Sequence, residues 1–206
     1  MLMNNFAITA IVLAAGFSQR MGRFKPLLSL GGGRTIERVI NLFHTAGVED
    51  ILVVTGHCAT DIQQALRQMP ARCVKNQDYR RGMFSSVLAG IRALPSQCGA
   101  FFIHPADIPL VRTQTVRRLM AVGEFSPASI LYPTFDGQRG HPTLIQRRLG
   151  AHILRWRGDG GLRALLAQYE TESLELPVED EAVLWDLDTP RDYSRMLARL
   201  ARANQR

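Results

Sequence analysis

Two basic side chains stand close together in the loop that follows an apolar run near the N-terminus. The run AITAIVLA, residues 7–14, is followed by Ala15 and Gly16, and then by Arg20 and Lys25. Small residues let backbone N–H groups approach a ligand closely, while an arginine adds a fork of donors and a lysine a point charge. The loop therefore fits a cradle for phosphate oxygens, although a basic surface turn would have the same composition. Neither the dinucleotide fingerprint G-x-G-x-x-G nor a P-loop is present.

Acidic side chains follow two later apolar runs, at positions where strands of a parallel sheet would end. Asp107 comes after the run 99–105 and stands between two prolines that stiffen the turn. Asp186 and Asp188 stand two apart in WDLDTP, so in an extended chain both point to the same face. Mg²⁺ prefers carboxylate and water oxygens and bridges to phosphates, so these acids predict a metal site. The alternatives are an ordinary turn acid at Asp107 and a helix cap at Asp188.

The elements that must position these residues alternate in type through the first half of the chain. Short apolar or β-branched runs predict strands, and amphipathic stretches between them predict helices. We expect strands at 7–14, 50–56, 71–76 and 99–105, and helices at 35–47, 61–69, 84–94 and 112–122. This alternation predicts an α/β fold with a Rossmann-like, doubly wound, mostly parallel sheet that carries helices on both faces. In such sheets ligands bind beyond the carboxyl ends of the strands, where the loop and acids described above lie.

After about residue 128 the alternation weakens, and a hairpin is expected. Strands at 128–135 and 143–146 around the turn DGQRGHP predict a small antiparallel addition to the sheet. Short helices are expected at 147–156 and 160–169, and late strands at 172–178 and 182–188. Near the end, Thr189 offers an N-cap and Pro190 a first helical position for an amphipathic helix. With no repeat or linker in sight, residues 1–206 are expected to form a single domain.

Composition limits the kinds of partner that the chain can have. Its 206 residues are 46% hydrophobic, enough for the core of one domain, and its formal net charge of +7 indicates an anionic partner. Lys25 and Lys75 are the only lysines, which sets Lys25 apart from generic surface charge. Cys58, Cys73 and Cys98 are odd in number and lack metal-ligand spacing, so we expect them reduced, in a cytoplasmic protein.

Membrane and nucleic-acid binding are not favoured. The apolar run at 6–15 is shorter than the roughly 20 residues that span a bilayer, and no basic segment typical of a signal peptide precedes it. The arginines are scattered over many elements without interleaved aromatic residues, and no nucleic-acid motif appears. We therefore expect small-molecule substrates.

The loop sequence LAAGFSQRMGRFK closely resembles the signature L-A-[AG]-G-x-S-x-R-M-G-x-x-K of the MobA-like nucleotidyltransferases. The resemblance continues, in the expected order, through RGMFSSVLAGI, PADIPLV, GQRGHP, GDGGLRALL and DLDTPRDY, and so covers most of the chain. The two alanines of the first motif and the pattern G-M-x-S-S most resemble the molybdenum cofactor cytidylyltransferases of that family. Phe84 departs from that pattern, since a small residue is common there. The fold implied is the nucleotide-diphospho-sugar transferase-like version of the doubly wound sheet.

This resemblance implies a Mg²⁺-dependent reaction, with Mn²⁺ as the alternative ion. CTP would donate CMP to the phosphate of molybdopterin carrying molybdenum, and pyrophosphate would leave. Lys25 would neutralise the α-phosphate and Arg20 the leaving pyrophosphate, with Asp107 and either Asp188 or Asp186 on the metal. Because the attacking phosphate is already ionised, no general base is needed. A molybdoenzyme is the expected recipient of the product.

The resemblance also implies two sets of binding residues. The nucleotide set is Leu13, Ala14, Ala15, Gly16, Arg20, Lys25, Gly82, Ser85 and Ser86. For Ser85 and Ser86, the first-turn capping of a helix is the alternative to contacts with the pyrimidine. The acceptor set is Arg139, His141, Asp159, Gly160 and Arg163, because an anionic pterin phosphate needs cations nearby.

Three other functions remain open. GTP could replace CTP, or a sugar or polyol phosphate could replace the pterin, with the fold and reaction kept. The first motif and the GHP and GDGG loops favour CTP and the pterin through the resemblance alone. A carrier that binds the cofactor without nucleotide turnover is an alternative of another class, which the set Arg20, Lys25 and Asp107 does not favour.

Overall fold

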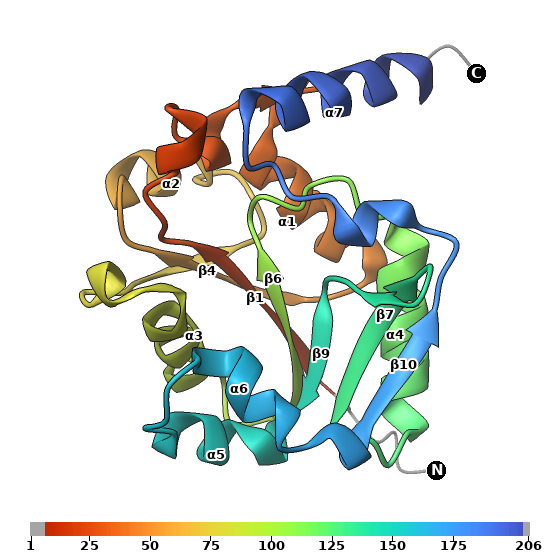
Figure 1. The fold of residues 1–206 in the computed structure, drawn as a ribbon. Coiled ribbons are helices and arrows are strands. Elements are labelled where there is room, and N and C mark those ends of the chain that lie inside the picture. Colours follow the sequence, from red (N-terminus) through yellow and green to blue (C-terminus); the bar gives the residue numbers. More distant parts are fainter. Residues whose placement is uncertain (1–6, 204–206) are drawn as a thin grey trace.

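The computed structural model describes residues 7–203 as one layered α/β unit (Figure 1). Its strands are β1 (Ala7–Ala14), β2 (Ser29–Leu30), β3 (Gly33–Arg34), β4 (Asp50–Thr55), β5 (Arg72–Lys75), β6 (Cys98–Pro105), β7 (Ile130–Phe135), β8 (Gln138–Arg139), β9 (Thr143–Gln146) and β10 (Ser173–Pro177). Its α-helices are α1 (Thr35–Ala46), α2 (Ala59–Ala65), α3 (Met83–Arg92), α4 (Thr113–Phe125), α5 (Gly150–Arg155), α6 (Gly161–Ala167) and α7 (Pro190–Ala203).

The main sheet is mostly parallel, as the sequence predicts. Its order is β10-β7-β9-β6-β1-β4-β5, with β8 paired to the end of β7. Strand β1 lies at the centre, parallel to β4 and to β6. Strand β9 runs antiparallel to both of its neighbours, β6 and β7, and is the antiparallel addition expected after the hairpin. The carboxyl ends of β1, β4 and β6 therefore meet at one edge of the sheet, toward the top of Figure 1.

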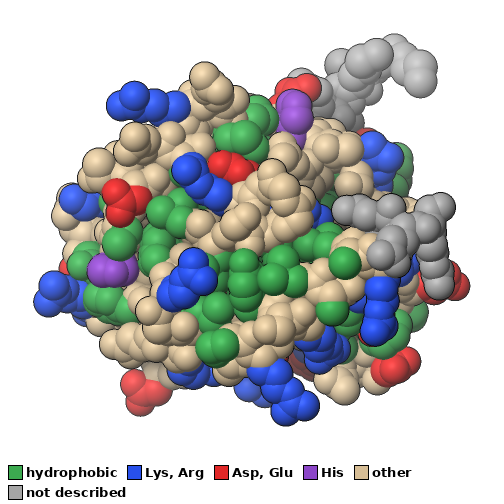
Figure 2. All heavy atoms as spheres, turned by 90° about the horizontal axis from the view of Figure 1, so that it is seen from above, with side chains coloured by type: hydrophobic (Ala, Val, Ile, Leu, Met, Phe, Trp, Pro, Cys, Tyr) green, Lys and Arg blue, Asp and Glu red, His purple; other side chains and the backbone are tan. Residues whose placement is uncertain are grey.

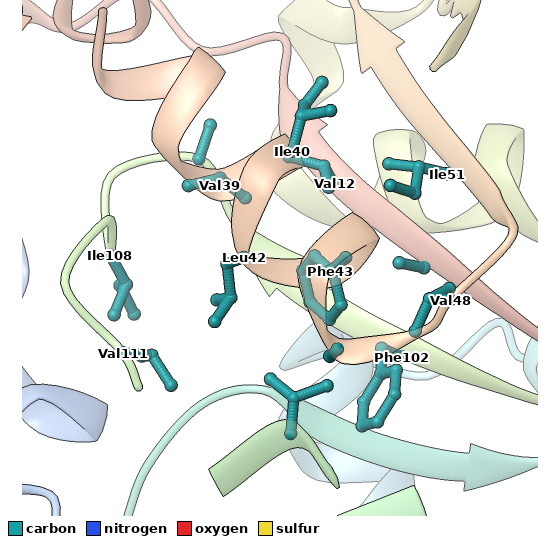
Figure 3. Close-up of a cluster of buried hydrophobic side chains, with 14 of the residues drawn as sticks. Val12, Val39, Ile40, Leu42, Phe43, Val48, Ile51, Phe102, Ile108 and Val111 are labelled. Atoms are coloured by element: carbon teal, nitrogen blue, oxygen red, sulfur yellow. The ribbon is translucent and has the colours of Figure 1, made fainter. Parts of the chain in front are cut away.

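Helices cover both faces of this sheet, and β1 shows why its sequence is apolar throughout. Its side chains alternate between two cores, because successive residues of a strand point to opposite faces. Ala10, Val12 and Ala14 enter the core beneath α1 and α4 (Figure 3). Ile11 and Leu13 enter the core beneath α3, α5 and α6. A strand buried on both faces reads as a continuous apolar run rather than an alternating one.

A third, smaller core holds α7 against the loop after β1. Met21, Leu28 and Leu30 from that loop pack with Leu187 and Met196. This cluster lies apart from the two cores of the sheet and joins the N-terminal loop to the last helix. It fixes the segment just before α7, where Asp188 lies.

One predicted element is wrong. The strand expected at 182–188 is a 3-10 turn, Glu181–Leu184, followed by irregular backbone. The buried Asp180 closes this turn, because its side chain accepts a hydrogen bond from the backbone N–H of Ala182. Residues 182–185 are apolar because this turn packs against the interior of the protein. A short apolar run of this kind has the same sequence pattern as a buried strand. The predicted helix 61–69 is also shorter, since α2 ends at Ala65.

Helix α3 approaches β1 so closely that Gly90 has no room for a side chain. A Cβ atom there would lie 2.5 Å from Cγ2 of Ile11 and 3.2 Å from Cγ2 of Val54. We predict that Gly90→Ala lowers the free energy of unfolding by about 1–3 kcal/mol, because overpacking outweighs the gain in helix propensity. Urea denaturation followed by circular dichroism measures this.

Gly150→Ala in α5 is the matched control. A Cβ at Gly150 meets only the far end of the flexible Arg147 side chain at less than 3.0 Å. Its stability should stay level or rise by up to about 1 kcal/mol, because alanine is the better helix former. Equal effects of the two substitutions would contradict the close approach of α3 to β1.

Candidate active site

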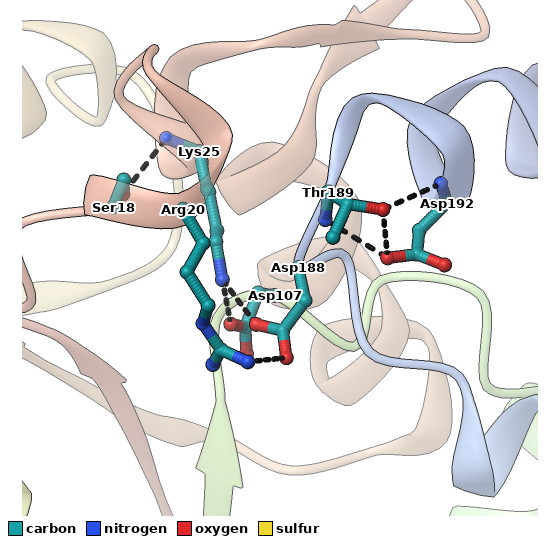
Figure 4. A network of polar contacts seen from close by, with 7 residues as sticks. All are labelled: Ser18, Arg20, Lys25, Asp107, Asp188, Thr189 and Asp192. Atoms are coloured by element: carbon teal, nitrogen blue, oxygen red, sulfur yellow. Dashed lines mark hydrogen bonds and ion pairs between the residues drawn. The ribbon is translucent and has the colours of Figure 1, made fainter.

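Lys25 lies between two carboxylates at the carboxyl edge of the sheet (Figure 4). Its ammonium Nζ donates to Oδ2 of Asp107 at 2.9 Å and to Oδ1 of Asp188 at 2.6 Å. The Lys25 side chain is only 10% exposed. Arg20 reaches the same place from the solvent side, with Nη1 2.8 Å from Oδ2 of Asp188. We call Lys25, Asp107 and Asp188 the charge clamp.

The charge clamp keeps Lys25 protonated despite its burial. Burial by itself lowers the pKa of an amine, because it disfavours the charged form. The hydrogen bonds that Lys25 donates to Asp188 and then to Asp107, together with the negative charges of these two residues, outweigh this effect and raise the pKa of Lys25 above its ordinary value. The site therefore holds a fixed positive charge over the whole physiological pH range.

Backbone hydrogen bonds join the three segments that supply the charge clamp. The N–H of Ala106 donates to the carbonyl of Leu13 at 3.0 Å, and the N–H of Leu187 donates to the carbonyl of Asp107 at 2.8 Å. The loop after β1, the turn after β6 and the segment before α7 are thus tied in series. The positions of Asp107 and Asp188 are set by the main chain rather than by their own side chains.

The loop after β1 is shaped by a residue in a left-handed conformation. Ser18 has φ 56°, and its Oγ accepts a hydrogen bond from the backbone N–H of Lys25 at 3.1 Å. That bond closes the loop and aims the Lys25 side chain inward. Ser18 is part of the LAAGFSQRMG motif, but sequence reasoning gave it no role, because a positive φ at a non-glycine residue leaves no clear signal.

Asp188 is not the cap of α7. The predicted cap Thr189 exchanges hydrogen bonds with Asp192: Thr189 N and Oγ1 donate to Oδ2 of Asp192, and the backbone N–H of Asp192 donates back to Oγ1. This closes the first turn of the helix and leaves the Asp188 carboxylate for Lys25 and Arg20. The capping alternative raised for Asp188 is therefore wrong, because Thr189 does that work.

Asp186 lies beside the charge clamp without joining it. Asp186 is exposed, yet partial desolvation of its carboxyl, followed by the negative charges of Asp107 and Asp188, raises its pKa from 3.8 to about 6. Its carboxyl thus faces two acids without a cation in contact. With Asp188 and Asp192 it lines a pocket of about 260 Å³ at the start of α7.

A cavity of about 300 Å³ opens at the charge clamp. Of the predicted nucleotide-binding residues, it is lined by Leu13, Ala14, Ala15, Gly16, Lys25, Gly82 and Ser86, together with Asp107. Phe17, Tyr79, Arg80 and Met83 form walls that sequence reasoning did not single out. Arg20 stands outside this lining, on the Asp188 side. The cavity joins the loop after β1 to the start of α3, although Lys25 and Gly82 are 57 residues apart in the sequence.

Ser85 and Ser86 take part in a network centred on a residue that sequence reasoning missed. The Asn76 amide donates to Oγ of Ser85 at 2.8 Å and to Oγ of Ser86 at 3.0 Å. Its carbonyl oxygen accepts from the backbone N–H of Asp78 at 2.9 Å. The Ser85 hydroxyl also lies within donating distance of the carbonyls of Asp78 and Gly82, and no side chain among the described residues caps the start of α3, so the capping alternative for Ser85 is not what the structure shows. Asn76 follows β5 directly, and the strand-end rule that pointed to Asp107 would have found it.

The predicted acceptor residues do not gather at the cavity. Arg139 lies on β8, beside the end of β7, where Glu170 and Glu175 pair with it and its guanidinium stacks on Tyr132 at 4.5 Å. His141 is half-buried, and its buried Nδ1 has no hydrogen-bond partner among the described residues. Burial lowers the pKa of His141, so its imidazole is held neutral.

Asp159, Gly160 and Arg163 are exposed around the N-terminus of α6. Their link to the cavity is indirect: a Cβ at Gly161 would lie 3.4 Å from Cβ of Phe84, the residue after Met83 in the cavity wall. The Gly160–Gly161 turn has positive φ at both positions, 79° and 61°, which only glycine adopts freely.

The donor set suits a cation that arrives with phosphate. Within residues 7–203, no group of three or more His, Cys, Asp or Glu side chains is placed to hold a metal ion. Asp107 and Asp188 nevertheless converge on one cation, the Lys25 ammonium. Mg²⁺ commonly takes one or two carboxylates and completes its shell with water and substrate phosphates. Asp107 and Asp188, which converge beside the cavity, could supply the two carboxylates of such a coordination shell.

The raised pKa of Asp186 makes a prediction about stability in the protein without ligands. A carboxyl whose folded pKa lies above its unfolded value adds stability below pH 3.8 and loses it as the pH rises through about 6. Asp186→Asn should therefore raise the melting temperature at pH 7.5 and leave it almost unchanged at pH 4. Differential scanning calorimetry at both values, with EDTA, measures this.

The exposed Glu49→Gln, in the turn before β4, is the matched control and should shift neither melting temperature measurably. A melting temperature of Asp186→Asn that falls at pH 7.5 would show instead that the Asp186 charge is stabilising, and would contradict the crowding of three acids described above.

Full-length relatives differ in the activities that their names describe. The chain is 30% identical over 199 residues to the nicotine blue oxidoreductase of Paenarthrobacter nicotinovorans, covering 92% of this chain and 96% of that one. It is 27% identical over 189 residues to the molybdenum cofactor cytidylyltransferase of Escherichia coli, covering 91% and 94%. It is 36% identical over 169 residues to the bifunctional IPC transferase and DIPP synthase of Rubrobacter xylanophilus, covering 75% of this chain but only 38% of that longer protein.

A solved structure has the same fold. A nucleotidyl transferase from Methanothermobacter thermautotroptrophicus superposes with a TM-score of 0.83 at 28% identity, covering 96% of this chain and 99% of that one. The family model of the MobA-like NTP transferase domain matches residues 10–173, which include Lys25, Asp107 and the cavity walls. No helix in the described part of the chain is long and apolar enough to cross a membrane. The chain belongs to the MobA-like NTP transferase family and is a nucleotidyltransferase of the nucleotide-diphospho-sugar transferase fold.

Proposed function

We propose that the protein transfers CMP from CTP to the terminal phosphate of molybdopterin carrying molybdenum, and releases pyrophosphate. The product is the cytosine dinucleotide form of the cofactor, and a molybdoenzyme is its recipient. The E. coli molybdenum cofactor cytidylyltransferase, similar over almost its whole length, supports this substrate pair, as do the LAAG and GMFSS motifs. Nucleic acid and membrane have no part in the proposal.

The observation that carries the proposal is the position of Lys25. Its ammonium lies at the base of the phosphate-sized cavity, between two carboxylates that suit a divalent cation. Positive charge at this point serves a reaction that needs positioning and charge neutralisation more than covalent help. A carrier that only bound the pterin would have no use for such an arrangement.

The reaction balances without a general base. An oxygen of the acceptor phosphate, already ionised, attacks the α-phosphorus and forms a new P–O–P bond. The bond from the α-phosphorus to the oxygen that bridges to the β-phosphorus breaks, and pyrophosphate leaves with that electron pair. Lys25 faces the α-phosphate, and Arg20, exposed on the Asp188 side, faces the leaving pyrophosphate. Backbone N–H groups from Ala14 to Gly16 hold the triphosphate.

Asp107 and Asp188 would hold Mg²⁺, or Mn²⁺, through their carboxylate oxygens. The ion would supply further neutralisation of the phosphate charge. For the ion to take that place, Lys25 must turn from the carboxylates to the phosphate, which exchanges one charge-assisted contact for another. Asp186, at the edge of the same site, is the remaining carboxylate within reach.

Pyrophosphate release with molybdenum-loaded molybdopterin tests the proposal. In Mg²⁺, CTP should support release and GTP, ATP and UTP should not. Lys25→Met should lower kcat by about 10²–10³-fold, because it removes a fixed charge that faces the reacting phosphate. Asp107→Asn should show a similar loss. Lys75→Met, which replaces the only other lysine at an exposed position on β5, is the matched control and should keep full activity.

Each contrary result has a distinct meaning. Release with GTP alone would keep the reaction and replace the base. Release from CTP with a sugar or polyol phosphate, but not with the pterin, would replace the acceptor. Stable pterin binding to folded protein without release from any nucleotide would identify a carrier and overturn the proposal.

A further inference from the structure

A groove of about 850 Å³ lies between α7 and the body of the protein. It is much larger than the nucleotide cavity, and the two linings have no residue in common. Five arginines line the groove: Arg38, Arg112, Arg195, Arg199 and Arg202. Figure 2 looks down on this side of the molecule, where lysine and arginine side chains stand around a band of hydrophobic ones. We call this hollow the arginine groove.

Helix α7 supplies one wall of the arginine groove. Arg195, Arg199 and Arg202 follow each other at spacings of four and three, which places them on one side of the helix. The guanidiniums of Arg195 and Arg199 lie 4.6 and 4.7 Å from the centre of the Trp185 ring. Stacking on an indole holds a guanidinium in place while leaving its N–H edge open to an acceptor.

The acids of the arginine groove are already engaged. Asp180 accepts from the backbone N–H of Arg112 at 2.8 Å and from Oγ1 of Thr115 at 2.7 Å, besides the bond from Ala182. Glu181 pairs with Arg199. These contacts belong to the turn that closes the floor of the groove. They leave the groove with three more arginines than acids.

Three arginines of the groove have no carboxylate within 4.0 Å in the described part of the chain: Arg38, Arg195 and Arg202. Arg38 is the most confined of them: its Nη1 donates to the carbonyls of Leu30 and Gly31 at 3.4 Å, whereas its buried Nε has no hydrogen-bond partner among the described residues. A buried guanidinium N–H without an acceptor is costly, and an oxyanion is the partner that guanidinium groups match best. The groove is therefore built to receive a phosphate or a carboxylate.

The arginine groove adjoins the active site. Trp185 and Arg195 line both the groove and the pocket of Asp186 and Asp188. The proposed nucleotide cavity shares no lining residue with either the pocket of Asp186 and Asp188 or the groove. A molecule whose phosphate attacks beside Asp188 can therefore extend past Trp185 into the groove without meeting the nucleotide.

We propose that the arginine groove binds an oxyanion carried by the acceptor substrate at the end remote from its attacking phosphate. This proposal rests on the nucleotidyl transfer proposed above. In this proposal Arg38, Arg195 and Arg202 are the cations of the acceptor site, because Arg139 is paired with Glu170 and Glu175 and His141 is held neutral. The acceptor class is then an anion with two separated anionic groups rather than a simple monophosphate.

Fluorescence of Trp185 tests the anion site without any catalysis. Trp156→Phe leaves Trp185 as the only tryptophan, and tripolyphosphate and citrate serve as probes in the absence of nucleotide. Emission should change saturably with either probe, and not with sodium chloride at the same ionic strength. Arg202→Gln, which removes a guanidinium that is not stacked on the indole, should weaken binding about tenfold. Arg118→Gln, exposed on α4, is the matched control and should bind as the parent does.

Isothermal titration calorimetry with the unmodified chain provides the same comparison if Trp156→Phe proves unstable. Saturable binding that Arg202→Gln weakens and Arg118→Gln spares supports the site. The absence of saturable binding, or equal weakening by the two substitutions, overturns it.

Steady-state kinetics then distinguish the acceptor from a separate anion. With the pterin acceptor, Arg202→Gln should raise the KM for acceptor about tenfold and leave kcat and the KM for CTP unchanged. An unchanged KM for acceptor, together with anion binding in the fluorescence titration, overturns the link to the acceptor. If the parent protein transfers no nucleotide, the proposed function fails and the acceptor link with it, while the titration alone decides whether the groove binds oxyanions.

Discussion

Lys25 places a buried positive charge between two carboxylates that lie 82 and 163 residues away from it in the sequence. A buried ion without partners is costly, so the two acids must be brought to it accurately. The main-chain bonds from Ala106 to Leu13 and from Leu187 to Asp107 do this. The central strands, the turn after β6 and the start of α7 are all arranged so that these charges meet.

The parts of the molecule that sequence predicted well are those governed by local patterns. A strand that is buried on both faces has a continuous apolar sequence, and this pattern predicts β1 and its neighbours β4 and β6. Residues at the carboxyl ends of such strands must share one edge, and that rule alone brought Lys25 and Asp107 together. Thr189 is predicted as the cap of α7 because a threonine directly before Pro190 is a local signal.

The parts that sequence did not predict depend on partners far along the chain. Arg139 looked like an acceptor cation until its pairing with Glu170 and Glu175 was seen, and neither acid is near it in sequence. The strand expected at 182–188 is absent because Asp180 closes a turn there. No sequence motif predicts the arginine groove, because its residues come from separate elements: α1, the start of α4 and α7 each contribute only one or a few of them.

The distance in sequence between Lys25 and Asp188 has a consequence for the protein while it is being made. A ribosome delivers β1, the phosphate loop and Asp107 well before it delivers the segment that precedes α7. Until then Lys25 has one carboxylate rather than two, and the small core of Met21, Leu28, Leu30, Leu187 and Met196 lacks its last two members. Asp188 is therefore the last residue of the charge clamp to be synthesised. A nascent chain contains the loop after β1 and Asp107 before it contains the second carboxylate that pairs with Lys25.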